Sequence, residues 1–242
     1  MRTQRVFWVA VGLVVAGSAA AAALFILPSG DARQTATSPT VVATIVIDAG
    51  SGGYDPGAVY AGVEEEDVNL TIAERVKALA ETDRRLRVVM TRTLDVYTSL
   101  DARVATANAA RPALYLSIQA NASGQHPEAA GIETWVASKV SPGSPSWQFA
   151  EILQSAVIAA TGARDRGVKS QELYIGRITS PAALLETGFL SNAAERDRLQ
   201  TPLYQEQIAT GIVKGILAYL EHAIPQFAAG DASGTTSSQR DR

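Results

Sequence analysis

The sequence contains no cysteine. Without thiols the chain forms no disulfide, carries no lipid on an N-terminal cysteine, uses no cysteine nucleophile and binds no metal through thiolates. Histidine is almost as scarce, because His126 and His222 are the only two in the chain. Chemistry that needs several imidazole groups is therefore severely restricted.

Clustered positive charge is also missing. The chain has 21 Lys and Arg residues against 24 Asp and Glu residues, for a formal net charge of −3. The densest basic run, Arg84, Arg85 and Arg87, reads as a solvated helix end. A nucleic-acid partner is therefore not expected.

The N-terminal residues 1–28 hold the longest apolar run. No charged residue occurs from Val6 to Leu27, and a helix of this length spans about 33 Å, enough to cross a bilayer. We predict a transmembrane anchor. A cleaved signal peptide is the alternative, since small residues occupy Gly17–Ala23. Arg2 and Arg5 favour a cytoplasmic N-terminus, with the rest of the chain outside.

Three further segments follow from composition. Residues 29–42 contain Ser, Thr, Pro and Gly but little to bury, and predict a linker. Residues 43–225 predict the folded domain, and residues 226–242 a disordered tail. The predicted location is the cell envelope, outside the cytoplasm and anchored in the cytoplasmic membrane. The alternative is secretion after signal cleavage.

Strand-like and helix-like patterns alternate through the folded part. Apolar runs predict strands at 44–48, 86–91, 113–119, 131–137 and 181–186, and helical periodicity predicts helices at 67–82, 99–110, 146–161 and 203–222. This alternation predicts a single α/β domain with a mostly parallel, twisted sheet covered by helices on both faces. Functional sites in such sheets gather where strands end. The loops after residues 48, 119 and 186 are therefore the candidates.

The first of these loops lies in VIDAGSGGYDPGA, residues 46–58. A phosphate-binding loop would need Gly-Lys-Ser/Thr or GxGxxG, and both are absent here. The segment is also close to the G-x-S-x-G elbow of serine hydrolases. That elbow turns directly into a helix, whereas Pro56-Gly57 follows here and disfavours one.

A wider set of motifs resembles the zinc-dependent N-acetylmuramoyl-L-alanine amidases of type 3, which cut peptidoglycan. The matching segments follow the family order: IVIDAGSGGYDPGAVYAGVEEEDVNLTIA (45–73), VVMTRTLDVYTSLDARVATAN (88–108), LYLSIQANAS (114–123), GIETWV (131–136), RGVK (166–169) and PAALLETGFLSN (181–192). The resemblance covers roughly residues 45–222 and implies the amidase fold.

The resemblance also implies a site. In the family, two histidines and a glutamate hold the zinc ion, which activates water, and a second glutamate moves the proton. The ligand positions correspond to Ser51, Glu65 and Gln119, so only Glu65 retains a family ligand. Glu186 corresponds to the catalytic glutamate. Asn121 and Glu133 correspond to residues that line the substrate groove.

A hydroxyl and an amide are poor zinc donors, so we expect no bound zinc unless the chain is active with a displaced ligand set. His126 is a candidate replacement ligand, although it also fits an exposed loop histidine. An all-oxygen site of Asp48, Ser51, Glu65 and Gln119 would take Mg²⁺ or Ca²⁺ weakly. Glu65 also fits a charged helix N-terminus without any metal.

The expected function follows from these substitutions. We predict an exported amidase-fold domain without catalytic activity that binds peptidoglycan, or that regulates or scaffolds other cell-wall or division proteins. One alternative is an active amidase that hydrolyses the MurNAc–L-Ala amide with a displaced set of zinc ligands. Another is a purely structural domain that binds proteins and no glycan.

Overall fold

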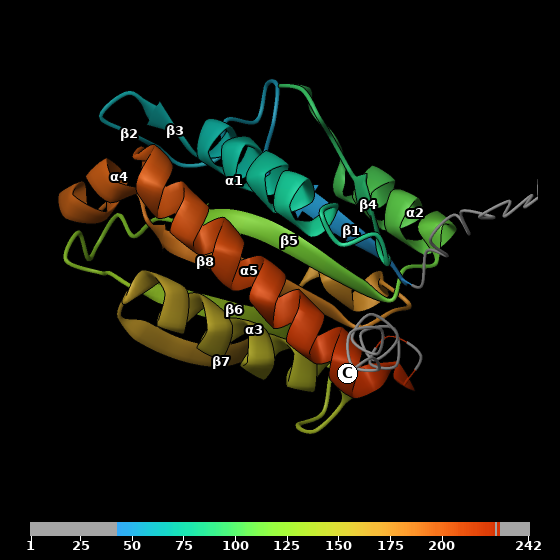
Figure 1. Cartoon of the computed structure of the whole chain (residues 1–242). Coiled ribbons are helices and arrows are strands. Elements are labelled where there is room, and N and C mark those ends of the chain that lie inside the picture. Colours follow the sequence, from blue (N-terminus) through green and yellow to red (C-terminus); the bar gives the residue numbers. More distant parts are fainter. Residues whose placement is uncertain (1–42, 226, 228–242) are drawn as a thin grey trace, which may run out of the picture. The chain divides into compact units, whose positions relative to one another are not determined.

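A six-stranded sheet forms the centre of the domain in a computed structural model that describes residues 43–225 and 227 (Figure 1). The strands, in their order across the sheet, are β4 (Leu86–Met90), β1 (Ala43–Ala49), β5 (Leu114–Asn121), β8 (Ala182–Phe189), β6 (Ile132–Ala137) and β7 (Asp165–Gln171). Neighbouring strands run parallel except β8 and β6, which pair antiparallel. The predicted mostly parallel sheet is therefore confirmed.

The central strands are buried on both faces. In β1, Ile45 and Ile47 belong to one hydrophobic core, whereas Val46 between them belongs to a second core on the other face. Strands covered on both sides read as nearly continuous apolar runs. For this reason β1, β5 and β8 were recognisable in the sequence.

Three long helices cover one face of the sheet: α1 (Glu65–Ala80), α3 (Pro145–Thr161) and α5 (Pro202–Ala223). Helix α5 packs between α1 and α3 (Figure 1). A β-carbon at Gly211 would lie 2.7 Å from the Cα of Val157 in α3, and one at Gly215 would lie 2.9 Å from the Cα of Leu153. The two glycines thus allow the close approach of α5 and α3.

Only two short elements cover the opposite face of the sheet in the described domain: α2 (Leu100–Ala110) and the 3₁₀ turn η1 (Tyr174–Arg177). Its smaller core includes Ala107 from α2 and Ile175 from η1, packed with Val46, Tyr115 and Leu184 of the sheet. Helices therefore cover both faces, as predicted. Three further elements complete the domain: a short hairpin of β2 (Val59–Tyr60) and β3 (Val63–Glu64), and helix α4 (Ala193–Leu199).

The five predicted strands and four predicted helices all form, with ends displaced by up to three residues. The sequence did not predict β7, the β2–β3 hairpin or α4. The predicted anchor, linker and tail fall in residues 1–42, 226 and 228–242, outside the described part of the chain. Among the described residues, no helix has the length and apolar character required to cross a membrane.

Candidate functional site

The residues singled out by the sequence meet at the carboxyl ends of β1, β5 and β8. Ser51 lies just beyond β1, and Gln119 of β5 pairs in register with Glu186 of β8. Glu186 in turn pairs with Glu133 of β6. The carboxyl edge of neighbouring parallel strands is the usual location of sites in α/β folds. We call Ser51, Glu65, Gln119 and Glu186 the strand-end site.

A glycine brings Ser51 and Glu65 together. A β-carbon at Gly57, where φ is +68°, would lie 2.5 Å from both Ser51 Oγ and Glu65 Oε2. Only a residue without a side chain leaves room for both groups. Glu65, the first residue of α1, thereby faces the loop that follows β1.

The protein itself orients the Glu65 carboxylate. The backbone N–H of Ala58 donates to Oε2 at 2.9 Å, while Asn69 Nδ2 and the N–H of Ala120 donate to Oε1, each at 3.1 Å. Burial raises the pKa of Glu65, and these hydrogen bonds to its charged form oppose the rise. A helix N-terminal charge alone does not account for such fixed contacts.

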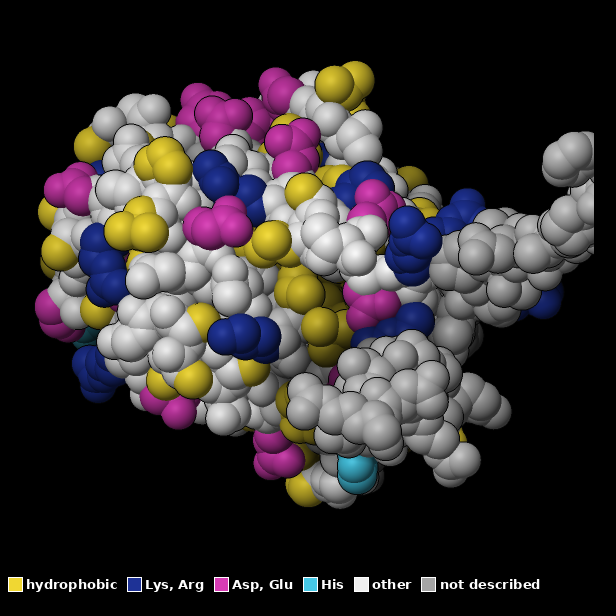
Figure 2. Space-filling model, in the orientation of Figure 1, with side chains coloured by type: hydrophobic (Ala, Val, Ile, Leu, Met, Phe, Trp, Pro, Cys, Tyr) yellow, Lys and Arg dark blue, Asp and Glu magenta, His cyan; other side chains and the backbone are white. Residues whose placement is uncertain are grey.

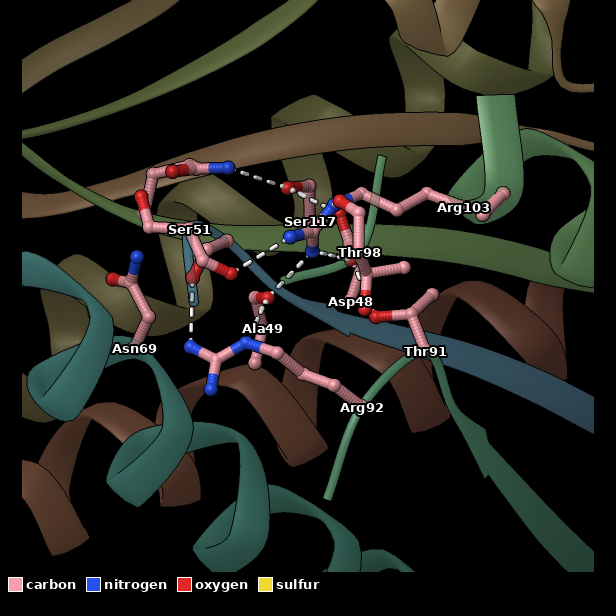
Figure 3. Close-up of polar contacts among 12 residues, drawn as sticks. Asp48, Ala49, Ser51, Asn69, Thr91, Arg92, Thr98, Arg103 and Ser117 are labelled. Carbon is pink, nitrogen blue, oxygen red and sulfur yellow. Dashed lines mark hydrogen bonds and ion pairs between the residues drawn. The ribbon is translucent and has the colours of Figure 1, made fainter. Parts of the chain in front are cut away.

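Beneath the site lies a buried charge, Asp48. Burial alone would raise its pKa, but Arg103, with Nη1 2.5 Å from Oδ1, and hydrogen bonds from Thr91, Tyr174 and Tyr115 lower it. Asp48 is therefore ionised at neutral pH, and an ionised carboxylate only accepts hydrogen bonds. Figure 3 shows Thr91 and Arg103 converging on it.

This charge sets the orientation of Gln119. Ser117 Oγ donates to Asp48 Oδ2 at 3.1 Å, so it has a lone pair left for Gln119 Nε2, which donates at 3.1 Å. The amino group of Gln119 thus points inward, and its carbonyl oxygen is the atom left for a ligand. Gly50 lies directly against this amide, because a β-carbon there would overlap it.

Two arginines hold the backbone of the loop (Figure 3). Arg92 donates to the carbonyl oxygens of Ala49 at 3.0 Å and Gly50 at 2.8 Å. Arg103 donates to those of Ala49 at 2.6 Å and Ser51 at 2.7 Å. Both arginines are almost completely buried. Their role was not predicted, although both stand in the segment 88–108 that carried the resemblance.

Glu186 has no such partners. Its Oε2 is buried and makes no hydrogen bond to the described residues. Burial, followed by the charges of Glu65 and Glu133, raises the pKa of Glu186 to about 8. The side chain is therefore largely protonated at neutral pH. A buried carboxyl group without a cation nearby takes up a proton for this reason.

Glu133, unlike Glu186, has several hydrogen-bond partners. Its carboxylate accepts hydrogen bonds from Asn121 Nδ2 at 3.0 Å, from Arg166 Nε at 2.6 Å and from Lys169. Burial acts to raise the pKa of Glu133, but Lys169 and Arg166 lower it overall. The structure thus joins Asn121 and Glu133, the two predicted substrate-binding residues, at one edge of the strand-end site.

His126 lies on the surface instead. Its side chain is 69% exposed, and its Nδ1 lies 3.2 Å from Glu128 Oε1. These contacts fit an exposed loop histidine. Within residues 43–225 and 227, no group of three or more His, Cys, Asp or Glu side chains is arranged to hold a metal ion.

Gln119, Glu186 and Glu133 thus lie in a row across β5, β8 and β6 at one edge of an α/β sheet, and comparison with known proteins identifies the family. The family model described as N-acetylmuramoyl-L-alanine amidase matches residues 45–218. The chain therefore belongs to the N-acetylmuramoyl-L-alanine amidase family.

Individual relatives agree with this assignment. The chain is 35% identical to the uncharacterized protein YqiI of Bacillus subtilis, over 77% of this chain and 89% of the relative. It is 36% identical to the amidase LytC of the same organism, over 75% of this chain but only 36% of LytC. It therefore spans about a third of LytC.

Solved structures share the fold. An N-acetylmuramoyl-L-alanine amidase from Clostridium difficile 630 superposes with a TM-score of 0.71 at 35% identity, over 75% of this chain and 98% of that one. The CwlD amidase from Clostridioides difficile, in complex with the GerS lipoprotein, superposes with a TM-score of 0.69 at 28% identity, over 74% of this chain and 99% of that one.

Proposed function

We propose that this domain binds peptidoglycan outside the cytoplasm without hydrolysing it, and that it regulates or scaffolds cell-wall enzymes. The observation that carries this proposal is the pair Ser51 and Gln119. These residues stand where the motifs of the family have zinc-binding histidines. The family membership supports peptidoglycan as the ligand.

The donors at these positions do not fit zinc. Serine keeps its proton at neutral pH, and the oxygen of an amide is a hard, weak ligand. A structural zinc site contributes about 10–16 kcal/mol over four ligands, so roughly 3 kcal/mol for each. Loss of two ligands then costs about 6 kcal/mol, or about four decades of affinity.

The remaining site suits binding. Hydrogen bonds within the protein fix the Glu65 carboxylate and the Gln119 amide, which reduces the entropy lost when a ligand is bound. Gln119 offers a carbonyl oxygen to an N–H donor, and the protonated Glu186 offers an O–H. Both groups suit the amide-rich chemistry of a stem peptide.

A protein partner is also consistent with the family. The similar CwlD amidase has been solved in complex with the GerS lipoprotein. For the present chain we propose a cell-wall or division protein as the partner. The predicted anchor in residues 1–28 would keep the domain at the outer surface of the cytoplasmic membrane, and signal cleavage would release it.

The second candidate is an active amidase with a displaced ligand set. It is favoured by the oriented carboxylate of Glu65 and by the presence of Glu186 at the catalytic position. In that case zinc would be the cofactor, and Glu65 the one family ligand retained. The hydroxyl of Ser51 and the amide of Gln119 nevertheless do not fit this ion.

Metal content and turnover distinguish the two candidates. The purified full chain is dialysed against zinc, analysed for bound metal, and incubated with purified sacculi to detect released stem peptides. The proposal expects sacculus binding, less than a tenth of an equivalent of zinc, and no release. One equivalent of zinc with turnover would establish the active amidase instead. A chain that binds no sacculi would favour the purely protein-binding domain.

A sharper experiment restores the ligands. In the double variant Ser51→His, Gln119→His, zinc affinity should rise by about four decades. The backbone supports this design, because φ at Ser51 is 57° and histidine is among the residues enriched at positive φ. The control is Ser51→Asn with Gln119→Asn, which suits the same backbone without imidazoles. Equal zinc affinity in the two double variants would contradict the proposal.

A further inference from the structure

Two tyrosines stack on each other at the surface beside the strand-end site. The ring centroids of Tyr54 and Tyr97 lie 4.0 Å apart, with an angle of 23° between the planes. Tyr54 is nevertheless 79% exposed and Tyr97 43% exposed. Val96, next to Tyr97, is 46% exposed. We call Tyr54, Val96 and Tyr97 the tyrosine shelf.

The shelf stands on a rigid backbone. Gly52 and Asp55 exchange backbone hydrogen bonds of 2.7 and 3.3 Å, so Tyr54 lies at the tip of a closed turn. The N–H of Gly53 also donates to Asp95 Oδ1 at 2.6 Å, which ties this turn to the segment that carries Tyr97. The rings are thus held in place before any ligand arrives.

Close backbone packing reinforces this link. A β-carbon at Gly52 would lie 2.5 Å from the carbonyl oxygen of Val96, and one at Gly53 would lie 3.1 Å from the carbonyl carbon of Val96. The loop of Ser51 and the loop of Tyr97 therefore pack directly against each other. The shelf continues the strand-end site, because Ser51 and Tyr54 belong to the same loop.

The fold gains little from this arrangement. Neither tyrosine belongs to the two hydrophobic cores of the described domain. Fixed aromatic rings with exposed faces are typical of ligand-binding surfaces. Leu203 is comparably exposed, at 73%, but its aliphatic side chain offers no aromatic face.

The acidic residues beside the tyrosine shelf limit the kinds of ligand that it can bind. Asp55 and Asp95 are exposed next to the shelf, and Figure 2 shows acidic and hydrophobic side chains together at the top of the molecule, where the loops after β1 and β4 meet in Figure 1. Negative charge disfavours nucleic acids, anionic lipids and other polyanions. Carboxylates instead accept hydrogen bonds from hydroxyl and acetamido N–H groups.

We propose that the tyrosine shelf binds a pyranose ring of an uncharged N-acetylated glycan strand, with the apolar face of the sugar on Tyr54. A sugar ring presents C–H groups on its face and hydrogen-bond donors at its rim, which matches an aromatic face bordered by carboxylates. This proposal deepens the proposed function, on which it rests, by assigning the glycan strand to the loop of Ser51.

The experiment uses two ligands and the full chain. A chitooligosaccharide supplies N-acetylated pyranose rings without peptide, and purified sacculi supply the complete polymer. Tyr54→Ala should weaken binding of the chitooligosaccharide by roughly 3- to 10-fold, the effect of one aromatic contact. Tyr54→Phe should bind as the natural chain does, and Leu203→Ala, at a comparably exposed position away from the loop, is the matched control. Circular dichroism confirms that each variant is folded.

The possible results separate this proposal from the proposed function. If the natural chain binds sacculi and Tyr54→Ala binds both ligands equally well, the shelf is not a glycan site and the proposed function stands. If the natural chain binds the chitooligosaccharide through Tyr54 but does not bind sacculi, the shelf stands and the proposed function fails. Absence of any chitooligosaccharide binding by the natural chain would overturn the shelf proposal.

Discussion

Replacement of the unpartnered carboxyl group by a neutral amide, Glu186→Gln, should make the protein more stable at high pH. In the folded chain, burial and the charges of Glu65 and Glu133 raise the pKa of Glu186 to about 8 from 4.5. In the unfolded chain the group ionises near the lower value. Folding at pH 8 therefore requires either uptake of a proton or burial of an unpaired charge.

The sign and size of the effect follow from this difference. A carboxyl group with a raised pKa in the folded state contributes fully to stability below pH 4.5, and that contribution is lost as the pH rises to about 8. Each pKa unit corresponds to ~1.4 kcal/mol, so the stability lost through Glu186 by pH 8 is at most about 5 kcal/mol. Although Glu186 Oε2 is buried, the residue as a whole is only half-buried, and solvent screening reduces the effect, so we expect about half of this value.

Urea unfolding followed by tryptophan fluorescence at several pH values between 5 and 8.5 measures the effect, with chelator present. The stability difference between Glu186→Gln and the natural chain should grow from pH 5 to about pH 8 and level off above it. Glu128→Gln is the control, because Glu128 is 75% exposed on its side chain. A constant difference across the range would refute the reasoning. If removal of the chelator and addition of zinc abolished the pH dependence, the metal-free interpretation would be wrong.

Two further predictions concern the loop that carries Ser51. Arg103→Met should lower the free energy of unfolding by about 3–5 kcal/mol, because it leaves the Asp48 charge buried without its charged partner. The control is Arg177→Met, which breaks an ion pair whose side chains, Arg177 and Asp101, are 51% and 86% exposed. This control should cost less than about 1 kcal/mol in the same urea titration. Gly52→Ala should cost about 1–3 kcal/mol or more, because φ is +130° and a backbone carbonyl blocks the added methyl group. Gly50→Ala displaces only the flexible end of a side chain and should cost clearly less; equal thermal shifts for the two glycine variants would contradict this account.

The elements that the sequence predicted are those whose pattern is dictated by burial. Strand β1 is buried on both faces and reads as an apolar run, and helix α5 carries a stripe of isoleucines along its buried face. Strand β7, with the sequence DRGVKSQ, lacks such a run because it is an exposed edge strand. The antiparallel pairing of β6 with β8 depends on chain direction in space, and local periodicity carries no information on that.

For the candidate site, too, the sequence determined some features and the tertiary structure others. The assignment of Ser51, Glu65, Gln119 and Glu186 to the family positions is a prediction from the sequence alone, because it rests on motif order and spacing. That neither Ser51 nor Gln119 carries an imidazole is read directly from the sequence. The expectation of weak zinc binding needs only the chemistry of those side chains.

Only the tertiary structure decided how these groups are oriented and charged. Asp48 fixes the direction of the Gln119 amide through Ser117, and the buried position of Glu186 keeps its carboxyl group protonated at neutral pH. The stack of Tyr54 on Tyr97 likewise joins loops far apart in the chain. The physical reason is that hydrogen-bond direction, pKa and ring stacking depend on distances and desolvation through space, which the fold sets and the order of residues does not reveal.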